Sequence, residues 1–265
     1  MTDYDVRSLY LDLLRRNLTR YGMHERMPAE WPLRRRLLFK AVNTLHSVRN
    51  ETGQYGRELG LDWPAEAETM IGMQRLTSLQ HCVETVLAED VPGDLIECGV
   101  WRGGACIMMR AVLAAYGDET RRVWLADSFQ GVPRSDPEKY QADRGIRSEF
   151  AAGILGVSEA DVRANFERYG LLDDRVCFLP GWFKDTLPGA AIEQVAVLRL
   201  DGDLYESTIQ ALDALYPRLS PGGFCIIDDY QAVKACEQAV TDYRAKHGIS
   251  AEIVNIDGTG ALWRK

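Results

Sequence analysis

The chain lacks the charge and hydropathy patterns of several large protein classes. It has no excess of positive charge, because 31 lysines and arginines are outnumbered by 39 acidic residues, for a formal net charge of −8. Nucleic-acid-binding surfaces concentrate basic residues, so this balance argues against nucleic acid as a partner. The one basic run, residues 34–36 in LRRRLL, is typical of a solvated helix face. No apolar run reaches the roughly 18–20 residues that span a bilayer, so we expect no membrane partner.

The sequence also lacks signs of secretion and of a disulfide framework. The start, MTDYDVRSLYLDLL, has no basic segment followed by an apolar core and a cleavage site. No two cysteines form a CxxC pair, and most have apolar neighbours, which indicates buried free thiols in a reducing compartment. We therefore expect a soluble cytoplasmic protein. The cysteines are Cys82, Cys98, Cys106, Cys177, Cys225 and Cys236.

What is present is a regular alternation of strand and helix patterns. Apolar spacing predicts N-terminal helices over 6–21, 33–48 and about 69–87, with a loop over 50–66. Ser158 is expected to cap a helix, with Asp161 three positions on, and a long polar loop covers 130–156. The expected strands lie within 91–100, 121–129, 175–181, 194–201 and, after the turn SPGG, 224–229, followed by a closing pair over 251–257 and 260–265.

This order predicts an α/β fold in one domain. Strands joined by helices form a doubly wound sheet with right-handed crossovers. We expect seven strands, mostly parallel, with an antiparallel C-terminal strand. The N-terminal helices and loop of residues 1–90 are expected to be integrated with the core of residues 91–265. Ligands of such sheets bind beyond the carboxyl ends of the strands, so chemistry is to be sought in the turns that follow them.

The first such turn, DLIECGVWRGGA at 94–105, is rich in glycine. Gly99, Gly103 and Gly104 permit a tight turn and close approach of backbone to a ligand, although packing of strand against helix is the simpler reading. The spacing is not GxGxxG, and no P-loop lysine follows, which favours a ligand without pyrophosphate. Asp127 ends the next strand, where an acid can accept both hydroxyls of a ribose, or can merely cap a loop. Together these features favour S-adenosylmethionine, whose ammonium group could meet Glu97 or the backbone near Gly99.

Carboxylates follow two expected neighbouring strands. Asp201 and Asp203 end one strand, and Asp228 and Asp229 end the next. Converging carboxylates repel one another unless a cation joins them, and all-oxygen ligation suits Mg²⁺ or Ca²⁺. The alternative is that they cap the following helices. Beside a methyl donor, a divalent ion would lower the pKa of an acceptor hydroxyl, and a carboxylate would remove its proton.

At these residues the chain resembles the macrocin O-methyltransferase family, whose members methylate sugar hydroxyls of glycosylated natural products with Mg²⁺ and S-adenosylmethionine. The matching segments cover most of the chain and include ETMIGMQRLTSLQHCVE (68–84), VPGDLIECGVWRGGACI (91–107), VWLADSFQGVP (123–133), AVLRLDGDLY (196–205) and YPRLSPGGFCIIDDY (216–230). The resemblance implies a Rossmann-like class I methyltransferase fold. It also implies a lid over residues 50–68 and a homodimer or homotetramer, in which the helix LYLDLLRRNL would pack on a second subunit.

The resemblance further implies the residues of the site. Asp201, Asp228 and Asp229 would bind Mg²⁺, and Asp201 would be the catalytic base. The methyl donor would be surrounded by Thr69, Met70, Glu97, Gly99, Trp101, Arg102, Gly103, Gly104, Ala105, Asp127, Ser128, Phe129, Gly181, Trp182 and Phe183.

Residues 22–50 and 134–157 depart from the family pattern, and Leu204 stands where a serine is common. Because of these differences, the resemblance does not determine which acceptor is methylated. We expect a sugar hydroxyl of a macrolide, aminocoumarin or similar glycoside. A phenolic or polyketide hydroxyl is the second interpretation. A non-catalytic subunit that binds an adenosine ligand is the third, and the complete set of three aspartates speaks against it.

Overall fold

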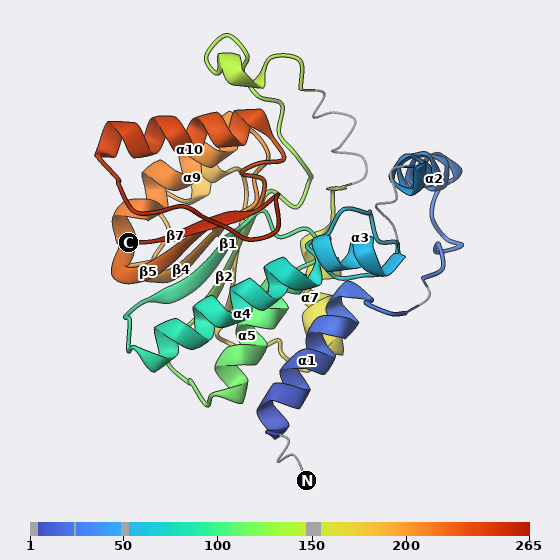
Figure 1. Ribbon diagram of the computed structural model, residues 1–265, viewed down its shortest axis with the longest axis horizontal. Coiled ribbons are helices and arrows are strands. Elements are labelled where there is room, and N and C mark those ends of the chain that lie inside the picture. Colours follow the sequence, from blue (N-terminus) through green and yellow to red (C-terminus); the bar gives the residue numbers. More distant parts are fainter. Residues whose placement is uncertain (1–4, 24, 49–52, 147–154) are drawn as a thin grey trace.

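The computed structural model describes residues 5–23, 25–48, 53–146 and 155–265. Strands and helices alternate along most of the chain (Figure 1). The helices are α1 (Val6–Thr19), α2 (Leu33–Val48), α3 (Gly53–Leu59), α4 (Met73–Ala88), α5 (Gly104–Ala115), η1 (Gln141–Asp143), α7 (Glu159–Arg168), α8 (Phe183–Thr186), α9 (Tyr205–Leu215), η2 (Tyr216–Arg218) and α10 (Lys234–His247). The strands are β1 (Asp94–Cys98), β2 (Val123–Asp127), β3 (Val176–Pro180), β4 (Val195–Leu200), β5 (Leu219–Ile227), β6 (Val254–Asn255) and β7 (Ala261–Arg264).

The strands form one seven-stranded sheet in the order β3-β2-β1-β4-β5-β7-β6. The first five pair in parallel, and β7 pairs antiparallel with both β5 and β6. All six residues of β4, VAVLRL, are buried, as expected for a central strand covered on both faces. The chain order reverses between β1 and β4, and this places their carboxyl ends at the point where doubly wound sheets bind ligands. The predicted fold is confirmed.

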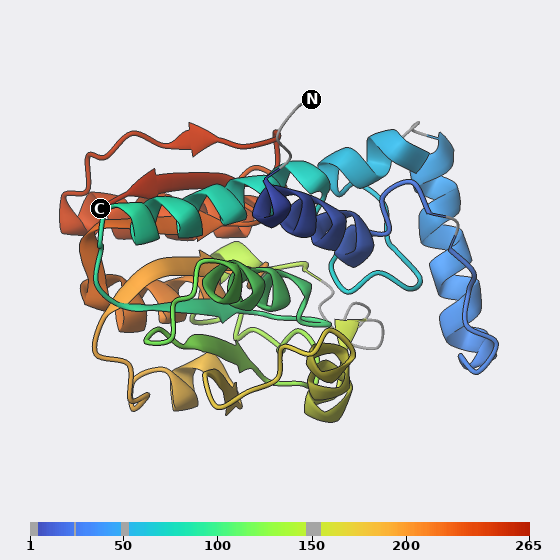
Figure 2. The same cartoon turned by 90° about the horizontal axis from the view of Figure 1, so that it is seen from below.

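Helices cover both faces of the sheet. The helices α1, α4, α5 and α7 pack on one face, and α9 and α10 on the other (Figure 1). Successive residues of a strand pack into the hydrophobic cores on opposite faces of the sheet. Leu95 of β1 packs with α1, α4, α5 and α7, and Ile96 packs on the face of α9 and α10. The helix α2 lies apart from the sheet in both views (Figures 1 and 2). Its Asn43 exchanges two hydrogen bonds with the backbone of Trp63.

Several expected boundaries need correction. The helix expected from Thr69 begins at Met73, and its N-cap Gly72 lies directly against the backbone at the end of α3. The expected loop over 50–66 contains α3, and that over 130–156 contains η1; residues 49–52 and 147–154 lie outside the described part. The turn SPGG belongs to β5, whose register with β4 shifts there, and β6 keeps only two residues of its expected segment.

The predicted helix cap at Ser158 and the predicted free cysteines are confirmed. Ser158 accepts a hydrogen bond from the backbone N–H of Asp161, as the capping pattern predicted. All six cysteines are free, and all but the half-buried Cys177 are buried. On α1 the core-facing residues are Leu11, Leu14 and Leu18, which leaves the other apolar residues of the helix exposed. In the described part of the chain, no helix combines the length and apolar character needed to cross a membrane.

Candidate active site

A cavity of about 680 Å³ opens beyond the carboxyl ends of β1, β2, β4 and β5. Its wall combines the glycine-rich turn after β1 with the acidic ends of the other strands, since it includes Gly99, Asp127, Asp201 and Asp228. The segment that follows α3 closes another part of the wall with Leu61 and Trp63. The turns that the sequence singled out therefore meet around one space.

The turn after β1 is held tightly against the next two strands. Gly99 has φ +89°, and a Cβ added to it would lie 1.8 Å from the carbonyl oxygen of Asp201. Asp127 accepts backbone N–H groups from Val100 and Phe129, one on each carboxylate oxygen and each at 2.7 Å. A carboxylate oxygen has a further lone pair, so Asp127 can fix the turn and still accept a ligand hydroxyl.

The predicted donor residues divide into two groups. Ten line the cavity: Thr69, Met70, Glu97, Gly99, Trp101, Asp127, Ser128, Gly181, Trp182 and Phe183. The other five, Arg102, Gly103, Gly104, Ala105 and Phe129, lie outside its wall. Arg102 instead donates to the carbonyls of Ala65 and Ala67, and Phe129 packs against Phe178 at 6.0 Å between ring centroids. The structure therefore brings ten of the fifteen predicted donor residues to the cavity wall.

Three aspartates converge as the strand order predicted. Asp201, Asp228 and Asp229 each offer a carboxylate oxygen, and these atoms lie within 4.8 Å of one another. Burial, and then the charge of neighbouring carboxylates, raises the pKa of Asp201 and of Asp229 well above the usual value. Asp203 also lines the cavity, in a left-handed backbone conformation, and burial with the charge of Asp228 raises its pKa to about 6. This concentration of negative charge favours a bound cation.

Helix capping does not explain these aspartates. Leu204 precedes α9 and Val233 precedes α10, and neither helix receives a side-chain cap from its own N-cap residue. The first N–H groups of α9 are taken instead by Asp143, a buried carboxylate of η1, which accepts from Tyr205 and Glu206. The alternative that the strand-end aspartates are helix caps is therefore wrong.

The residues fit a small divalent cation. The donor set consists of carboxylate oxygens, which Mg²⁺ and Ca²⁺ prefer. Asp229 also has an oxygen, Oδ2, that is buried and has no hydrogen-bond partner. A buried polar oxygen without a partner is costly, and an ion between the three aspartates would satisfy it.

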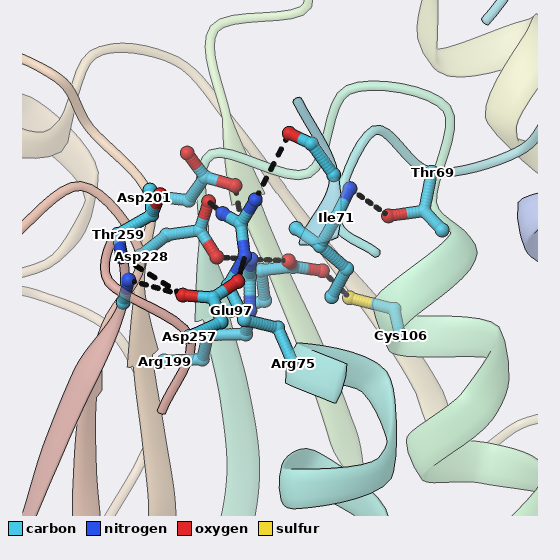
Figure 3. A network of polar contacts seen from close by, with 12 residues as sticks. Thr69, Ile71, Arg75, Glu97, Cys106, Arg199, Asp201, Asp228, Asp257 and Thr259 are labelled. Atoms are coloured by element: carbon cyan, nitrogen blue, oxygen red, sulfur yellow. Dashed lines mark hydrogen bonds and ion pairs between the residues drawn. The ribbon is translucent and has the colours of Figure 1, made fainter. Parts of the chain in front are cut away.

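Two buried arginines that sequence reasoning missed hold the carboxylates in place (Figure 3). Arg199, in β4, forms ion pairs with Glu97, with Asp228 and, at 3.1 Å, with Asp201. Arg75, in α4, pairs with the other oxygen of Asp228 at 2.5 Å. The remaining oxygen of Glu97 accepts the thiol of Cys106 at 2.8 Å. The Glu97 carboxylate is therefore engaged within the protein, although the residue lines the cavity. The sequence did indicate that Arg199 is special, because it is the one charged residue in the apolar run VAVLRL.

The strand order, the glycine turn after β1 and the acid that ends β2 define a methyltransferase of the Rossmann-like class. Comparison with known proteins resolves the family. Residues 7–265 match the model of the family described as Macrocin-O-methyltransferase (TylF), and the chain belongs to this family. It is thus an enzyme that transfers a methyl group to oxygen, and its fold and family imply S-adenosylmethionine as the methyl donor.

Two curated relatives and one solved structure are similar over almost their whole length. The chain is 55% identical to the 8-demethyl-8-(2,3-dimethoxy-alpha-L-rhamnosyl)-tetracenomycin-C 4'-O-methyltransferase of Streptomyces olivaceus, over 98% of this chain and 94% of the relative. It is 49% identical to the Mycinamicin III 3''-O-methyltransferase of Micromonospora griseorubida, over 97% and 96%. The structure of the O-methyltransferase NovP superposes with a TM-score of 0.85 at 46% identity, covering 98% of this chain and 99% of NovP.

Proposed function

We propose that the chain methylates a sugar hydroxyl of a glycosylated natural product, using S-adenosylmethionine and a Mg²⁺ ion held by Asp201, Asp228 and Asp229. The observation that carries the proposal is the convergence of these three carboxylates in the same cavity as the glycine turn and Asp127. The name of the 55% identical relative, which includes a rhamnosyl group, supports the choice of a sugar acceptor.

The protein's part in the donor site is to orient a methyl group and exclude water. Asp127 is placed to accept the ribose hydroxyls, and the backbone at Gly99 approaches the donor closely because it carries no side chain. Trp182 and Phe183 supply apolar walls for the adenine. Positioning the donor in line with the acceptor oxygen supplies much of the rate enhancement.

The metal site prepares the acceptor. A divalent ion bound there would lower the pKa of an acceptor hydroxyl and stabilise its developing negative charge. Asp201 then takes the hydroxyl proton as general base. The new bond joins the acceptor oxygen to the methyl carbon, the sulfur–carbon bond breaks, and S-adenosylhomocysteine leaves.

We assign the acceptor part of the cavity to the expected lid segment and to one segment that departs from the family pattern. Leu61 and Trp63 line the wall from residues 50–68, and Arg134 and Leu155 line it from residues 134–157. Leu204, where a serine is common in the family, is fully buried and lies outside the wall, so it does not line the acceptor pocket.

A panel of acceptors tests the proposal. With labelled donor and Mg²⁺, we expect label to enter glycosides and to be released with the sugar on hydrolysis, while the matched aglycones remain unlabelled. A chelator should abolish turnover, and added Mg²⁺ should restore it. Aglycones or simple phenols that outperform every glycoside would overturn the sugar assignment, and full activity in chelator would overturn the metal assignment.

We also propose a cytoplasmic homodimer or homotetramer, supported by the free thiols and by apolar residues on the outer face of α1. Val6 is 78% exposed and Leu13 64% exposed, although both lie on an otherwise well-packed helix. Replacing Leu13 by lysine should shift the sedimentation coefficient toward that of the monomer. Lysine at Val254, an apolar residue 50% exposed on β6, is the control and should leave assembly unchanged. A monomeric wild-type protein at micromolar concentration would contradict the proposal.

A further inference from the structure

Arg75 lies where three separate parts of the chain meet at the edge of the cavity. It belongs to the first turn of α4, and it is only 7% exposed. Its guanidinium contacts the end of β5, the turn between β6 and β7, and the segment that follows α3. A buried arginine with partners on three elements is a rigid connection between them, because its fork fixes the direction of each contact.

The first contact orients a metal-binding carboxylate. Nη1 of Arg75 donates to Oδ2 of Asp228 at 2.5 Å, while Arg199 donates to Oδ1 of the same carboxylate (Figure 3). Asp228 is thereby held from both sides. Only its remaining lone pairs are free for an ion shared with Asp201 and Asp229. Arg75 thus supports a metal ligand without itself contacting the ion.

The second contact anchors Arg75 itself. Its Nε forms an ion pair with Oδ2 of Asp257 at 2.9 Å. The other oxygen of Asp257 accepts the backbone N–H groups of Thr259 and Gly260, each at 2.9 Å. The turn between β6 and β7 therefore places a carboxylate charge beside the base of the guanidinium.

The third contact reaches the wall of the cavity. Nη2 of Arg75 donates to the carbonyls of Leu59 and Gly60, each at 3.2 Å. Gly60 also crosses Gly72 so closely that a Cβ on Gly60 would lie 2.4 Å from the Gly72 nitrogen and 2.5 Å from Nη2 of Arg75. The chain continues directly into Leu61 and Trp63, which line the cavity. The position of this wall therefore depends on the same side chain that orients Asp228.

We propose that Arg75 is a positioning residue that holds both the metal ligand Asp228 and the cavity wall formed by residues 60–63. The inference rests on the proposed function, since it takes Asp228 as a ligand of Mg²⁺. One guanidinium fork holds both the carboxylate and the two carbonyls, so loss of the fork releases both of them together. Lysine has a single ammonium group and cannot reproduce this fork, although it keeps the positive charge.

The variant Arg75→Lys therefore separates geometry from charge. Magnesium chloride titrated into the full-length protein by calorimetry should bind about 10–100-fold more weakly than in the wild type, as found when a residue that orients a metal ligand is removed. Hydrogen exchange at the backbone amides of residues 57–63 should also become faster. Both measurements are independent of catalytic turnover.

Arg57→Lys is the matched control. Arg57 lies in α3, is 6% exposed and pairs with Asp62 at 2.7 Å, so its replacement loosens the same segment without touching Asp228. We expect faster exchange at residues 57–63 and unchanged Mg²⁺ affinity. Equal weakening of Mg²⁺ binding in the two variants would overturn the proposal, because loosening of the segment would then suffice.

A second variant keeps the test decisive if Arg75→Lys folds poorly. Asp257→Asn removes the charge that anchors Nε but keeps an oxygen to accept from Thr259 and Gly260. It should weaken Mg²⁺ binding in the same direction, by a smaller factor. Wild-type Mg²⁺ affinity in both variants would overturn the role of Arg75. Failure of the wild-type protein itself to bind Mg²⁺ would instead overturn the proposed function.

Discussion

Replacing Asp201 by alanine is expected to reduce turnover by at least about 10³-fold, because one change removes both the proposed general base and a ligand of the proposed ion. The side chain is well placed for both roles, since its carboxylate converges with those of Asp228 and Asp229 within 4.8 Å. Single-turnover methyl transfer to a glycoside measures the loss. Binding of S-adenosylhomocysteine, measured by calorimetry, should remain close to that of the wild type.

The control for Asp201→Ala is Asp213→Ala. Asp213 lies on α9, its side chain is 52% exposed, and it has only a distant ion pair with Lys246 at 3.9 Å, so its loss should leave turnover and donor binding unchanged. A parallel loss of donor affinity in Asp201→Ala would contradict the assignment, because it would place Asp201 in the donor site. Turnover near that of the wild type would contradict both of its roles.

The convergence of the three aspartates could be predicted because it follows from topology alone. The carboxyl ends of parallel strands share one edge of a sheet, so acids that end neighbouring strands must meet there. The same reasoning placed Asp127 beside the turn at Gly99. Local patterns with a fixed spacing also sufficed elsewhere, as for the cap at Ser158. Each of these predictions depends on neighbours in sequence or on strand order.

The supporting residues of the site follow no such rule. Arg75 meets Asp228 across 153 positions, and Asp143 caps α9 from 62 positions away. A buried arginine or aspartate in a helix or loop has the same sequence appearance as an exposed one, since only tertiary packing removes it from water. For the same reason the apolar spacing of α1 did not reveal which of its leucines face the core: Leu9 and Leu13 are exposed while Leu11 and Leu18 are buried.

The turn after β1 and the end of β4 lie closer together than their separate motifs suggested. Gly99 is a proposed donor residue, but the nearest atom to its missing side chain is the carbonyl oxygen of Asp201. The backbone N–H of Asp201 in turn donates to the carbonyl of Cys98 at 2.8 Å. The proposed donor site and the proposed metal site are thus in direct backbone contact, which would provide the positioning that in-line transfer requires.

Gly99→Ala is therefore expected to damage both stability and catalysis. Its φ of +89° is strained for alanine, and the new Cβ would lie 1.8 Å from the carbonyl oxygen of Asp201, so we expect a loss of roughly 3–5 kcal/mol in the free energy of unfolding. Ordinary contact needs 3.4 Å, so one backbone must move by more than about 1 Å, a misplacement that can cost about 10²-fold in rate. Urea denaturation and single-turnover kinetics measure the two effects.

Gly189→Ala is the control for Gly99→Ala, because a Cβ at Gly189 meets no atom within 4 Å and its φ is not left-handed. It should change the free energy of unfolding by less than about 0.5 kcal/mol and leave the rate unaltered. If Gly99→Ala lost stability but kept the wild-type rate at low temperature, where it remains folded, the contact would be structural only. Loss of methyl-donor affinity and of Mg²⁺ affinity together, from one methyl group on one residue, is the result that direct contact between the two centres requires.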